Sequence, residues 1–270
     1  MNRPGDPRGT LTFRHRLPVR IWHWVNAVTV LVMLMSGLSI FNAHPRLYWG
    51  EYGANQDRAW LEIGGIGDRG LMRVGPVVIP TTGVLGRWTD AEGRPARRAF
   101  PYWATLPAHY SLAEGRRWHL AFAWVLGIGT VLYAVWSLVA RHLTRDLMPR
   151  RAELTPKAIW HDLRDHLRLR LPKGDAALRY NLLQKLAYLM VLLILLPLLI
   201  ATGLTMSPAL NAAWPWLLEL FGGRQSARSI HFICAAGMTG FVVVHLVMVV
   251  LAGPVNELRS MITGWIRVRR

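Results

Sequence analysis

The chain has 270 residues, 52% of them hydrophobic, with 13 tryptophans and a mean hydropathy of +0.23, which is too apolar for an ordinary soluble domain. Its formal net charge is +17. Its single cysteine, Cys234, excludes disulfide bonds within the chain, iron–sulfur clusters held by this chain alone, and C-x-x-C-H attachment of haem.

Four long apolar stretches predict membrane-spanning helices. A helix needs roughly 20 apolar residues to cross a hydrocarbon core about 30 Å thick. Stretches of this kind lie at about 21–41, 118–140, 186–206 and 230–252. The predicted fold class is therefore an all-α membrane protein, a four-transmembrane-helix bundle in which residues 1–270 form a single membrane domain.

The basic residues predict the orientation of these spans. Twenty of the 32 lysines and arginines lie before the first span, between the second and third, and after the fourth. By the positive-inside rule, both termini are expected to be cytoplasmic. The positive charge is then explained by topology and by contact with lipid headgroups, and no nucleic-acid partner is expected.

Residues 42–117 form an unusually long connection between the first two spans. Their many aromatic residues and prolines predict a compact periplasmic loop or cap rather than a disordered segment. Gly65, Gly67 and Gly70 match the G-x-G-x-x-G pattern of dinucleotide sites, which requires a strand before it and a helix after it. Neither is visible in the sequence, so we interpret these residues as loop glycines.

The connector between the second and third spans, 141–180, contains a predicted amphipathic helix on the cytoplasmic surface. Apolar residues recur there at helical spacing, opposite arginines and aspartates. They are Trp160, Leu163, Leu167 and Leu171. In the third span, Pro197 predicts a tolerable kink.

Four of the ten histidines lie within or just inside the predicted spans, where an imidazole is costly unless something binds it. They are His23, His119, His231 and His245. The other six lie in polar segments and are interpreted as surface or interfacial residues: His15, His44, His109, His142, His161 and His166.

Helix geometry arranges the four span histidines in two pairs. His231 and His245 are fourteen residues apart, which is a rise of about 21 Å and brings them within about 40° of the same helix face. With a cytoplasmic N-terminus, the first span runs outward and the second inward. His119 is then expected at the depth of His231 near the periplasmic side, and His23 at the depth of His245 near the cytoplasmic side.

Each pair is expected to hold one haem iron. A zinc site takes three or four protein ligands, whereas only two fall at each depth here. Two axial imidazoles suit a haem, whose porphyrin supplies the other four ligands. Hydrogen bonding of histidines across helices is the alternative. Arg20, Arg117 and Arg228 lie beside the predicted ligands and are candidates for propionate contacts. Small residues expected to leave room for the macrocycles are Gly37, Gly127, Gly129, Ala235, Ala236, Gly237 and Gly240.

Four segments resemble a known family, namely "HRLPVRIWHW", "RRWHLAF", "YNLLQKLAY" and "RSIHF…VVVHLVMVVLAG". They are similar to the di-haem cytochrome b subunits of the bacterial cytochrome b561 and nickel–iron hydrogenase cytochrome b type, a family that includes formate dehydrogenase gamma subunits. The resemblance implies a multi-pass protein of the bacterial inner membrane with two b haems. It also implies electron transfer between a periplasmic redox partner and membrane quinone, either ubiquinone or menaquinone.

Carried over onto this sequence, the resemblance implies that His119 and His231 bind a periplasmic haem iron, and that His23 and His245 bind a cytoplasmic one. Quinone in such subunits often lies near the cytoplasmic haem. Candidate quinone contacts, chosen by position alone, are Asn26, Asn181, Gln184, Lys185 and Tyr188. Helix-end capping and headgroup anchoring are the alternative roles for these five residues.

The "LYWG" segment in the long loop resembles subunits that accompany periplasmic molybdenum oxidoreductases, so the expected partner contains molybdenum. The expected function is an electron-transfer subunit of an oxidoreductase complex, with quinone reduction or oxidation at this chain. One alternative is a stand-alone quinone-linked haem b oxidoreductase of a small oxidant such as superoxide. Another is a metal-ion transporter, which would want polar or acidic groups at the bilayer midplane that the spans almost entirely lack.

Overall fold

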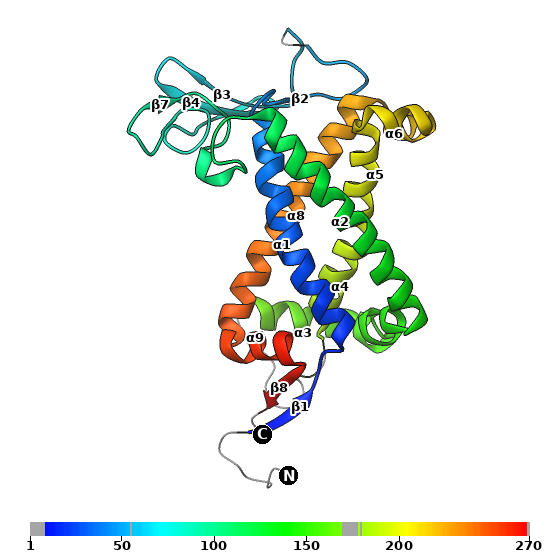
Figure 1. Cartoon of the computed structure of the whole chain (residues 1–270). Coiled ribbons are helices and arrows are strands. Elements are labelled where there is room, and N and C mark those ends of the chain that lie inside the picture. Colours follow the sequence, from blue (N-terminus) through cyan, green and yellow to red (C-terminus); the bar gives the residue numbers. More distant parts are fainter. Residues whose placement is uncertain (1–8, 55, 169–177, 179, 269–270) are drawn as a thin grey trace. The chain divides into compact units, whose positions relative to one another are not determined.

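The computed structural model describes the chain except residues 1–8, 55, 169–177, 179 and 269–270 (Figure 1). It is mostly helical, and four of its helices are long and apolar enough to cross a membrane. These four are α1 (Leu17–Phe41), α2 (Leu112–Val139), the helix Leu182–Met206, and α8 (Arg224–Ala252). The prediction of four spans is therefore confirmed, whereas the orientation of the termini stays a prediction.

The third span is irregular near its proline. It consists of α4 (Leu182–Met190), a π-helical turn η5 (Val191–Leu195) and α5 (Leu196–Met206). Pro197 is the second residue of α5, one residue beyond Leu196, which follows the π turn. Proline lacks an N–H and its ring crowds the carbonyl one turn back, so a wider turn at this point relieves the clash within the helix.

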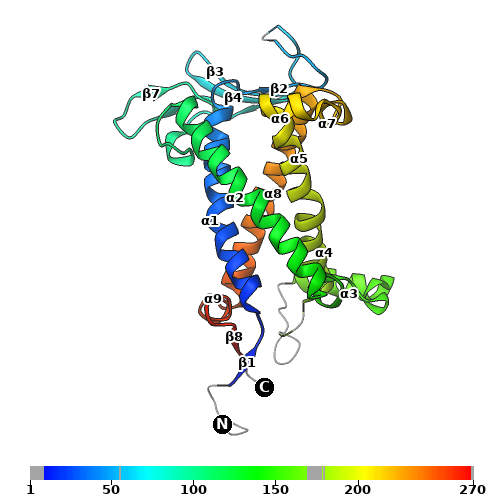
Figure 2. The ribbon, with the colours of Figure 1, turned by 45° about the vertical axis from the view of Figure 1, so that its right-hand side comes forward.

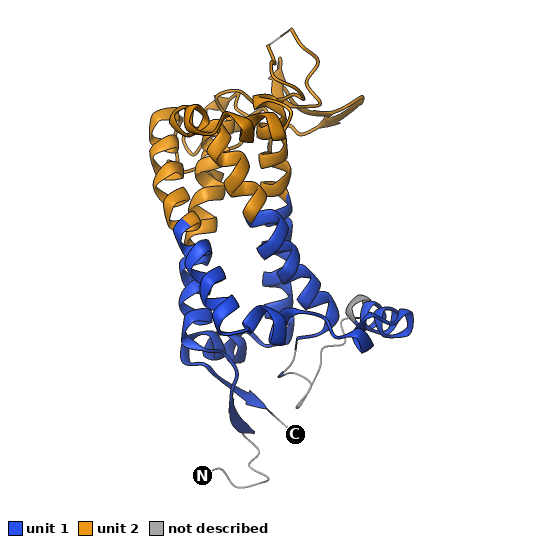
Figure 3. Ribbon diagram, turned by 90° about the vertical axis from the view of Figure 1, so that its right-hand side faces the viewer, with its two compact units in different colours: residues 1–27, 128–196, 237–270 blue, residues 28–127, 197–236 orange. Residues whose placement is uncertain are grey.

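The chain divides into two compact units, coloured separately in Figure 3. Unit 1 comprises residues 1–27, 128–196 and 237–270, and unit 2 comprises 28–127 and 197–236. The division falls inside α1, α2, α5 and α8. The organisation as a single membrane domain stays a prediction.

In unit 2, the long connection after α1 folds into strands. The main sheet is antiparallel, in the order β2-β3-β4-β5, and follows directly on the C-terminal end of α1 (Figures 1 and 2). Its strands are β2 (Arg46–Leu47), β3 (Leu61–Ile66), β4 (Arg69–Val74) and β5 (Val77–Pro80). A smaller ladder pairs β6 (Trp88–Thr89) with β7 (Pro95–Ala96), and the 3-10 turn η1 (Tyr102–Ala104) precedes α2.

The three glycines of the G-x-G-x-x-G match belong to the β3–β4 hairpin. Gly65 pairs with Gly70 across the ladder, and Gly67 turns the chain with φ +55°. A strand does precede the match, contrary to the sequence interpretation, but an antiparallel strand follows it instead of a helix. The interpretation as loop glycines was therefore wrong in detail, and the dinucleotide reading has no βαβ unit to support it.

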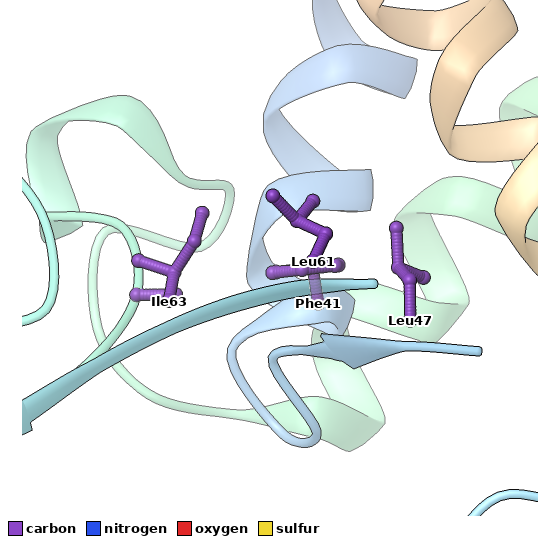
Figure 4. Packing of buried hydrophobic residues seen from close by; sticks show 5 residues of the cluster. Phe41, Leu47, Leu61 and Ile63 are labelled. Carbon is purple, nitrogen blue, oxygen red and sulfur yellow. The ribbon is translucent and has the colours of Figure 1, made fainter. Parts of the chain in front are cut away.

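A small apolar core fixes this sheet against the end of α1 (Figure 4). Phe41, Leu47, Leu61 and Ile63 are each 6% exposed or less. The ring of Phe41 also packs on Phe232 of α8, at 4.8 Å between centroids. Burial of each large apolar side chain contributes about 1.5–3 kcal/mol, so the long connection is held in place by packing.

Ion pairs on the sheet reinforce this packing. Glu62 accepts from Arg46 and from Arg73, both at 2.6 Å, one through each carboxylate oxygen. Burial alone would raise the pKa of Glu62, but the hydrogen bonds from the two guanidinium groups hold it below its ordinary value. All three side chains are partly exposed, so the network adds less than the core does.

Polar contacts join the connection to α8. Arg228 donates to the carbonyl oxygens of His44 and Arg46, and Ser229 Oγ donates to that of Tyr48 at 2.5 Å. Trp60 Nε1 donates to Ser229 Oγ at 2.9 Å. The 42–117 segment is thus anchored within unit 2, and its periplasmic location stays a prediction.

In unit 1, residues close to both chain ends pair in a two-stranded ladder. Strand β1 (Thr10–Phe13) is antiparallel to β8 (Trp265–Val268), which follows helix α9 (Pro254–Thr263). Arg14 pairs with Glu257 of α9 at 3.2 Å. No strand is predicted here from the sequence, because four-residue strands carry little periodicity.

His15 follows this ladder and is buried, 7% exposed. Burial, with the positive charge of Arg14 next, lowers the pKa of His15 from 6.5 to about 4. The ring is therefore neutral at pH 7. Its interpretation as a surface histidine was wrong.

The connector of unit 1 contains the predicted amphipathic helix, α3 (Pro156–Leu167). Trp160 is 65% exposed and Leu163 37% exposed, as expected for an apolar face that lies on a membrane surface. Leu171 lies outside the described residues. The connector also contains the π turn η2 (Leu143–Leu147) and the 3-10 turn η3 (Arg151–Leu154). In unit 2, the short helices α6 (Pro208–Ala213) and α7 (Pro215–Leu220) precede α8.

Candidate functional site

The structure brings the four span histidines together as two pairs, one in each unit. In unit 2, the ring centroids of His119 on α2 and His231 on α8 are 6.2 Å apart, with an interplanar angle of 62°. In unit 1, those of His23 on α1 and His245 on α8 are 6.1 Å apart, at 60°. We call His119 with His231 the first pair and His23 with His245 the second pair. Their role as iron ligands stays a prediction.

The spacing within each pair fits an iron atom between the two rings. A metal–imidazole nitrogen distance of about 2 Å on each side, plus roughly 1 Å from each nitrogen to its ring centroid, places the centroids about 6 Å apart. Both observed separations match this value.

The donor set also fits a haem better than a bare metal ion. Among the described residues, no group of three or more His, Cys, Asp or Glu side chains could hold an ion. A pair of imidazoles therefore needs a group that brings its own in-plane ligands, as a porphyrin does. Residues that could hold such a group through its iron are His119 and His231 in unit 2, and His23 and His245 in unit 1.

Each ring of the first pair has a hydroxyl behind it. Ser36 Oγ on α1 lies 3.0 Å from His119 Nδ1, and Thr202 Oγ1 on α5 lies 2.9 Å from His231 Nδ1. Both hydroxyl residues are fully buried. A hydrogen bond at Nδ1 orients the ring and leaves Nε2 as the nitrogen that can bind a metal.

A glycine follows each of these hydroxyl residues and lies against the same ring. A Cβ on Gly37 would lie 3.4 Å from His119 Cε1, and one on Gly203 would lie 3.6 Å from His231 Cε1. A larger side chain at either position would push the ring away. The Ser-Gly step on α1 and the Thr-Gly step on α5 thus support the two rings in the same way.

The second pair is supported differently. His245 stacks on Phe241, at 5.8 Å and 12°, and His23 contacts Trp24 edge-on at 5.1 Å. His23 Nδ1 is buried and has no hydrogen-bond partner within the described part of the chain. Tyr188, a predicted quinone contact, packs against Phe241 at 6.4 Å between centroids.

The small residues expected to make room for macrocycles serve several purposes. A Cβ on Gly127 or Gly240 would meet no atom of the described chain within 4 Å, which agrees with the expectation. The ring of Trp22 instead occupies the space beside Gly129. A Cβ on Gly237 would lie 3.5 Å from the side chain of Leu195. For these two glycines the prediction was wrong, because a neighbouring side chain fills the space.

The three arginines proposed for propionates have different surroundings. Arg228 donates hydrogen bonds to the carbonyl oxygens of His44 and Arg46, and Arg20 donates to that of Ile262. Arg117 is exposed and lines a shallow surface cavity of about 420 Å³ with Glu114 and other residues of α2. Their role as propionate contacts stays a prediction.

The five quinone candidates separate into two groups. Asn181 and Gln184 form a capping box at the start of α4, and Lys185 is buried in an ion pair with Glu153. The capping alternative is thus observed for the first two, and Lys185 is not a headgroup anchor. Asn26 Oδ1 is buried without a partner among the described residues, and Tyr188 contacts Phe241 beside His245.

Sequence reasoning missed the groups that support the histidines. Ser36 and Thr202 are hydroxyl residues in apolar spans, each followed by glycine, and this repeated pattern was the available signal. Glu153, the partner of Lys185, lies in the connector, 32 residues away in sequence. No local pattern could have linked those two residues.

Comparisons with known proteins identify the family. The family model described as prokaryotic cytochrome b561 matches residues 14–264. The chain belongs to this family. It is therefore a multi-pass membrane cytochrome of the haem b electron-transfer type, and the resemblance stated from the sequence is confirmed.

Curated relatives are similar over nearly their whole length. The chain is 27% identical to the "Putative protein-methionine-sulfoxide reductase subunit YedZ1" of Azospira oryzae, over 91% of this chain and 93% of that protein. It is 23% identical to a "Probable Ni/Fe-hydrogenase B-type cytochrome subunit" of Azotobacter vinelandii, over 95% and 88%. A protein of the same description from Cupriavidus necator is 20% identical, over 94% and 86%. No solved structure matches.

Proposed function

We propose that this cytochrome holds two b haems and passes electrons between a periplasmic redox partner and the membrane quinone pool. The observation that carries the proposal is the presence of two imidazole pairs, each with centroids about 6 Å apart. The pairs share helix α8, on which His231 and His245 are fourteen residues apart. One helix would then contribute a ligand to each haem.

The chain's own residues supply orientation and a water-poor surrounding. Ser36 and Thr202 orient the rings of the first pair, and Phe241 and Trp24 pack against those of the second. The bound haems would supply the one-electron couple. No other group of this chain is assigned to bond-making chemistry.

The charge distribution supports the proposed orientation. With both termini cytoplasmic, the first pair would lie near the periplasmic face and the second near the cytoplasmic face. The sheet of unit 2 would then be on the periplasmic side, where a soluble partner could dock.

The relatives support a partner of the oxidoreductase class. Two kinds of curated relative are described as subunits, one of a protein-methionine-sulfoxide reductase and one of a Ni/Fe-hydrogenase. We propose that this chain likewise serves a periplasmic oxidoreductase, with a molybdenum-containing one as the expected type. The "LYWG" segment is the sequence feature behind that choice.

We place the quinone near the second pair. Tyr188 and the unpartnered Asn26 Oδ1 are the remaining candidates for contact, since Asn181, Gln184 and Lys185 have structural partners. Protons taken up there by a reduced quinone would come from the cytoplasm, so that electron transfer from the periplasm would build membrane potential.

The test is oxidation of the reduced cytochrome by a soluble quinone analogue in detergent. Rapid return of the oxidised spectrum is expected for the wild type, and much slower oxidation for Tyr188→Phe with Asn26→Leu. Failure of quinone analogues to oxidise the wild type would contradict the quinone link. Turnover of superoxide by the purified chain, without any partner, would instead favour the stand-alone oxidoreductase.

A further inference from the structure

The hydroxyls behind the first pair are fixed as acceptors toward the histidines. Ser36 Oγ donates its proton to the carbonyl oxygen of Val32 at 2.6 Å, and Thr202 Oγ1 donates to that of Leu198 at 2.5 Å. A hydroxyl has one proton, so once it is used, the oxygen can only accept from a further neighbour. The imidazole must therefore be the donor in both contacts.

This arrangement selects one tautomer for each ring. With the proton on Nδ1 of His119 and of His231, each Nε2 carries a free lone pair. A lone pair on Nε2 is what an iron atom between the rings requires. The hydroxyls thus favour Nε2 as the nitrogen available to the metal, together with the carbonyl oxygens of Met33 and Leu199, which also accept from His119 and His231 respectively.

The same geometry occurs twice, on different helices. Each hydroxyl lies over the carbonyls three and four residues earlier in its helix: Ser36 Oγ is 3.3 Å from the oxygen of Met33, and Thr202 Oγ1 is 3.4 Å from that of Leu199. Each is followed by the glycine that packs on the ring. Because the same hydroxyl and glycine arrangement occurs at both histidines, chance packing is a poor explanation for it.

The second pair has no equivalent support at His23. The Nδ1 atom of that ring is buried and meets no acceptor among the residues that the structure describes. The ring of His245 is held by stacking on Phe241. Within the described chain, the ring of His23 therefore lacks the Nδ1 hydrogen bond that His119 and His231 make.

We propose that Ser36 and Thr202 are positioning residues that fix His119 and His231 as Nδ1–H tautomers and lower the reduction potential of the haem they hold. This inference rests on the proposed function, in which the first pair binds a haem. Donation from Nδ1 raises the basicity of Nε2, and a more basic ligand stabilises ferric iron relative to ferrous iron.

The test is a spectroscopic redox titration of the purified protein carrying Ser36→Ala and Thr202→Val. Mutation of a hydrogen-bond partner of a metal ligand commonly changes metal-site equilibria by tenfold or more. We expect the ferrous form of the first-pair haem to be favoured about tenfold, which is a rise of about 59 mV for one electron. The haem of the second pair should be unchanged, and a titration of His23→Ala, which retains only the first-pair haem, assigns the two components.

Two further variants distinguish positioning from a general packing defect. Ser36→Thr with Thr202→Ser keeps both hydroxyls and should keep the wild-type potential. Ser39→Ala with Thr205→Val is the control on the same two helices. It removes two buried hydroxyls that make no hydrogen bond to these histidines, and it should also leave the haem potential unchanged. If Ser36→Ala with Thr202→Val loses the haem while the hydroxyl-retaining variant keeps it, the orienting role is supported as well.

The inference is overturned if Ser36→Ala with Thr202→Val changes the equilibrium constant for reduction of the first-pair haem by less than about twofold. It is also overturned if Ser36→Thr with Thr202→Ser shifts the potential as much as the variant without hydroxyls. Failure of the proposed function looks different. In that case the wild-type protein itself would lack a haem that depends on His119 and His231.

Discussion

Removing the carboxylate of Glu153 is expected to destabilise unit 1 through Lys185. The ammonium group lies 2.8 Å from both oxygens of Glu153, and the side chains are 8% and 31% exposed. Burial alone would raise the pKa of Glu153, but the hydrogen bond from Lys185 holds it below its ordinary value. The carboxylate of Glu153 is therefore ionised at pH 7, and its contribution to stability is lost as the pH falls through the lowered pKa.

The magnitude follows from the unequal burial of the two groups. Leaving one member of a fully buried pair without its partner costs about 3–5 kcal/mol, because an uncompensated charge remains. Water reaches Glu153, which screens the pair, so Glu153→Gln should cost about 2 kcal/mol. For a chain of this length that corresponds to a fall in Tm of roughly 4–8 °C.

Thermal unfolding of the detergent-solubilised protein at pH 7 measures this change. Glu92→Gln is the matched control, because Glu92 and its partner Arg94 are 63% and 71% exposed and should contribute almost nothing. Replacing both Glu153 and Lys185 by leucine and methionine should restore much of the loss. Equal Tm values for Glu153→Gln and Glu92→Gln would refute the reasoning.

Three further predictions concern other parts of the chain. Because His15 has a pKa of about 4 when folded and 6.5 when unfolded, stability should fall by about 3 kcal/mol as the pH drops from 6.5 to 4. His15→Gln should flatten that slope in pH-dependent unfolding, and an unchanged slope would contradict the assignment. Gly203→Leu should displace His231 and abolish the first-pair haem in difference spectra. Gly203→Ala, whose Cβ would lie 3.6 Å from His231 Cε1, should retain that haem. Loss of the haem in both variants, or in neither, argues against the contact. Gly67→Ala should cost about 1–2 kcal/mol because φ is +55° there, whereas Gly64→Ala should be close to neutral in the same denaturation assay.

The spans were predictable because each is an apolar run long enough to cross a membrane, and the pairing of the histidines was predictable because it depends on helical periodicity. A 3.6-residue repeat fixes which residues share a face, and alternating span directions fix which ends meet. His119 with His231, and His23 with His245, are consequently the pairs found facing one another, with ring centroids 6.2 and 6.1 Å apart.

The support around those pairs was not predictable, because it depends on contacts between distant segments. The carbonyls over which Ser36 and Thr202 lie are local, but the rings they hold belong to other helices. The sheet after α1 was missed because its strands are short and its register depends on pairing between segments and on glycine turns, as at Gly67, which no local pattern specifies. The β1–β8 ladder joins residues near opposite ends of the chain, so no local sequence pattern predicts it.

The most direct test of the central claim is a haem count by reduced-minus-oxidised difference spectroscopy on the purified wild type and four single variants. The account predicts two b haems in the wild type and one in each of His23→Ala, His119→Ala, His231→Ala and His245→Ala. It further predicts that His119→Ala and His231→Ala lose the same spectral component, and that the other two variants lose the second. A full complement of haem in His231→Ala or His245→Ala, or no b haem in the wild type, would contradict it.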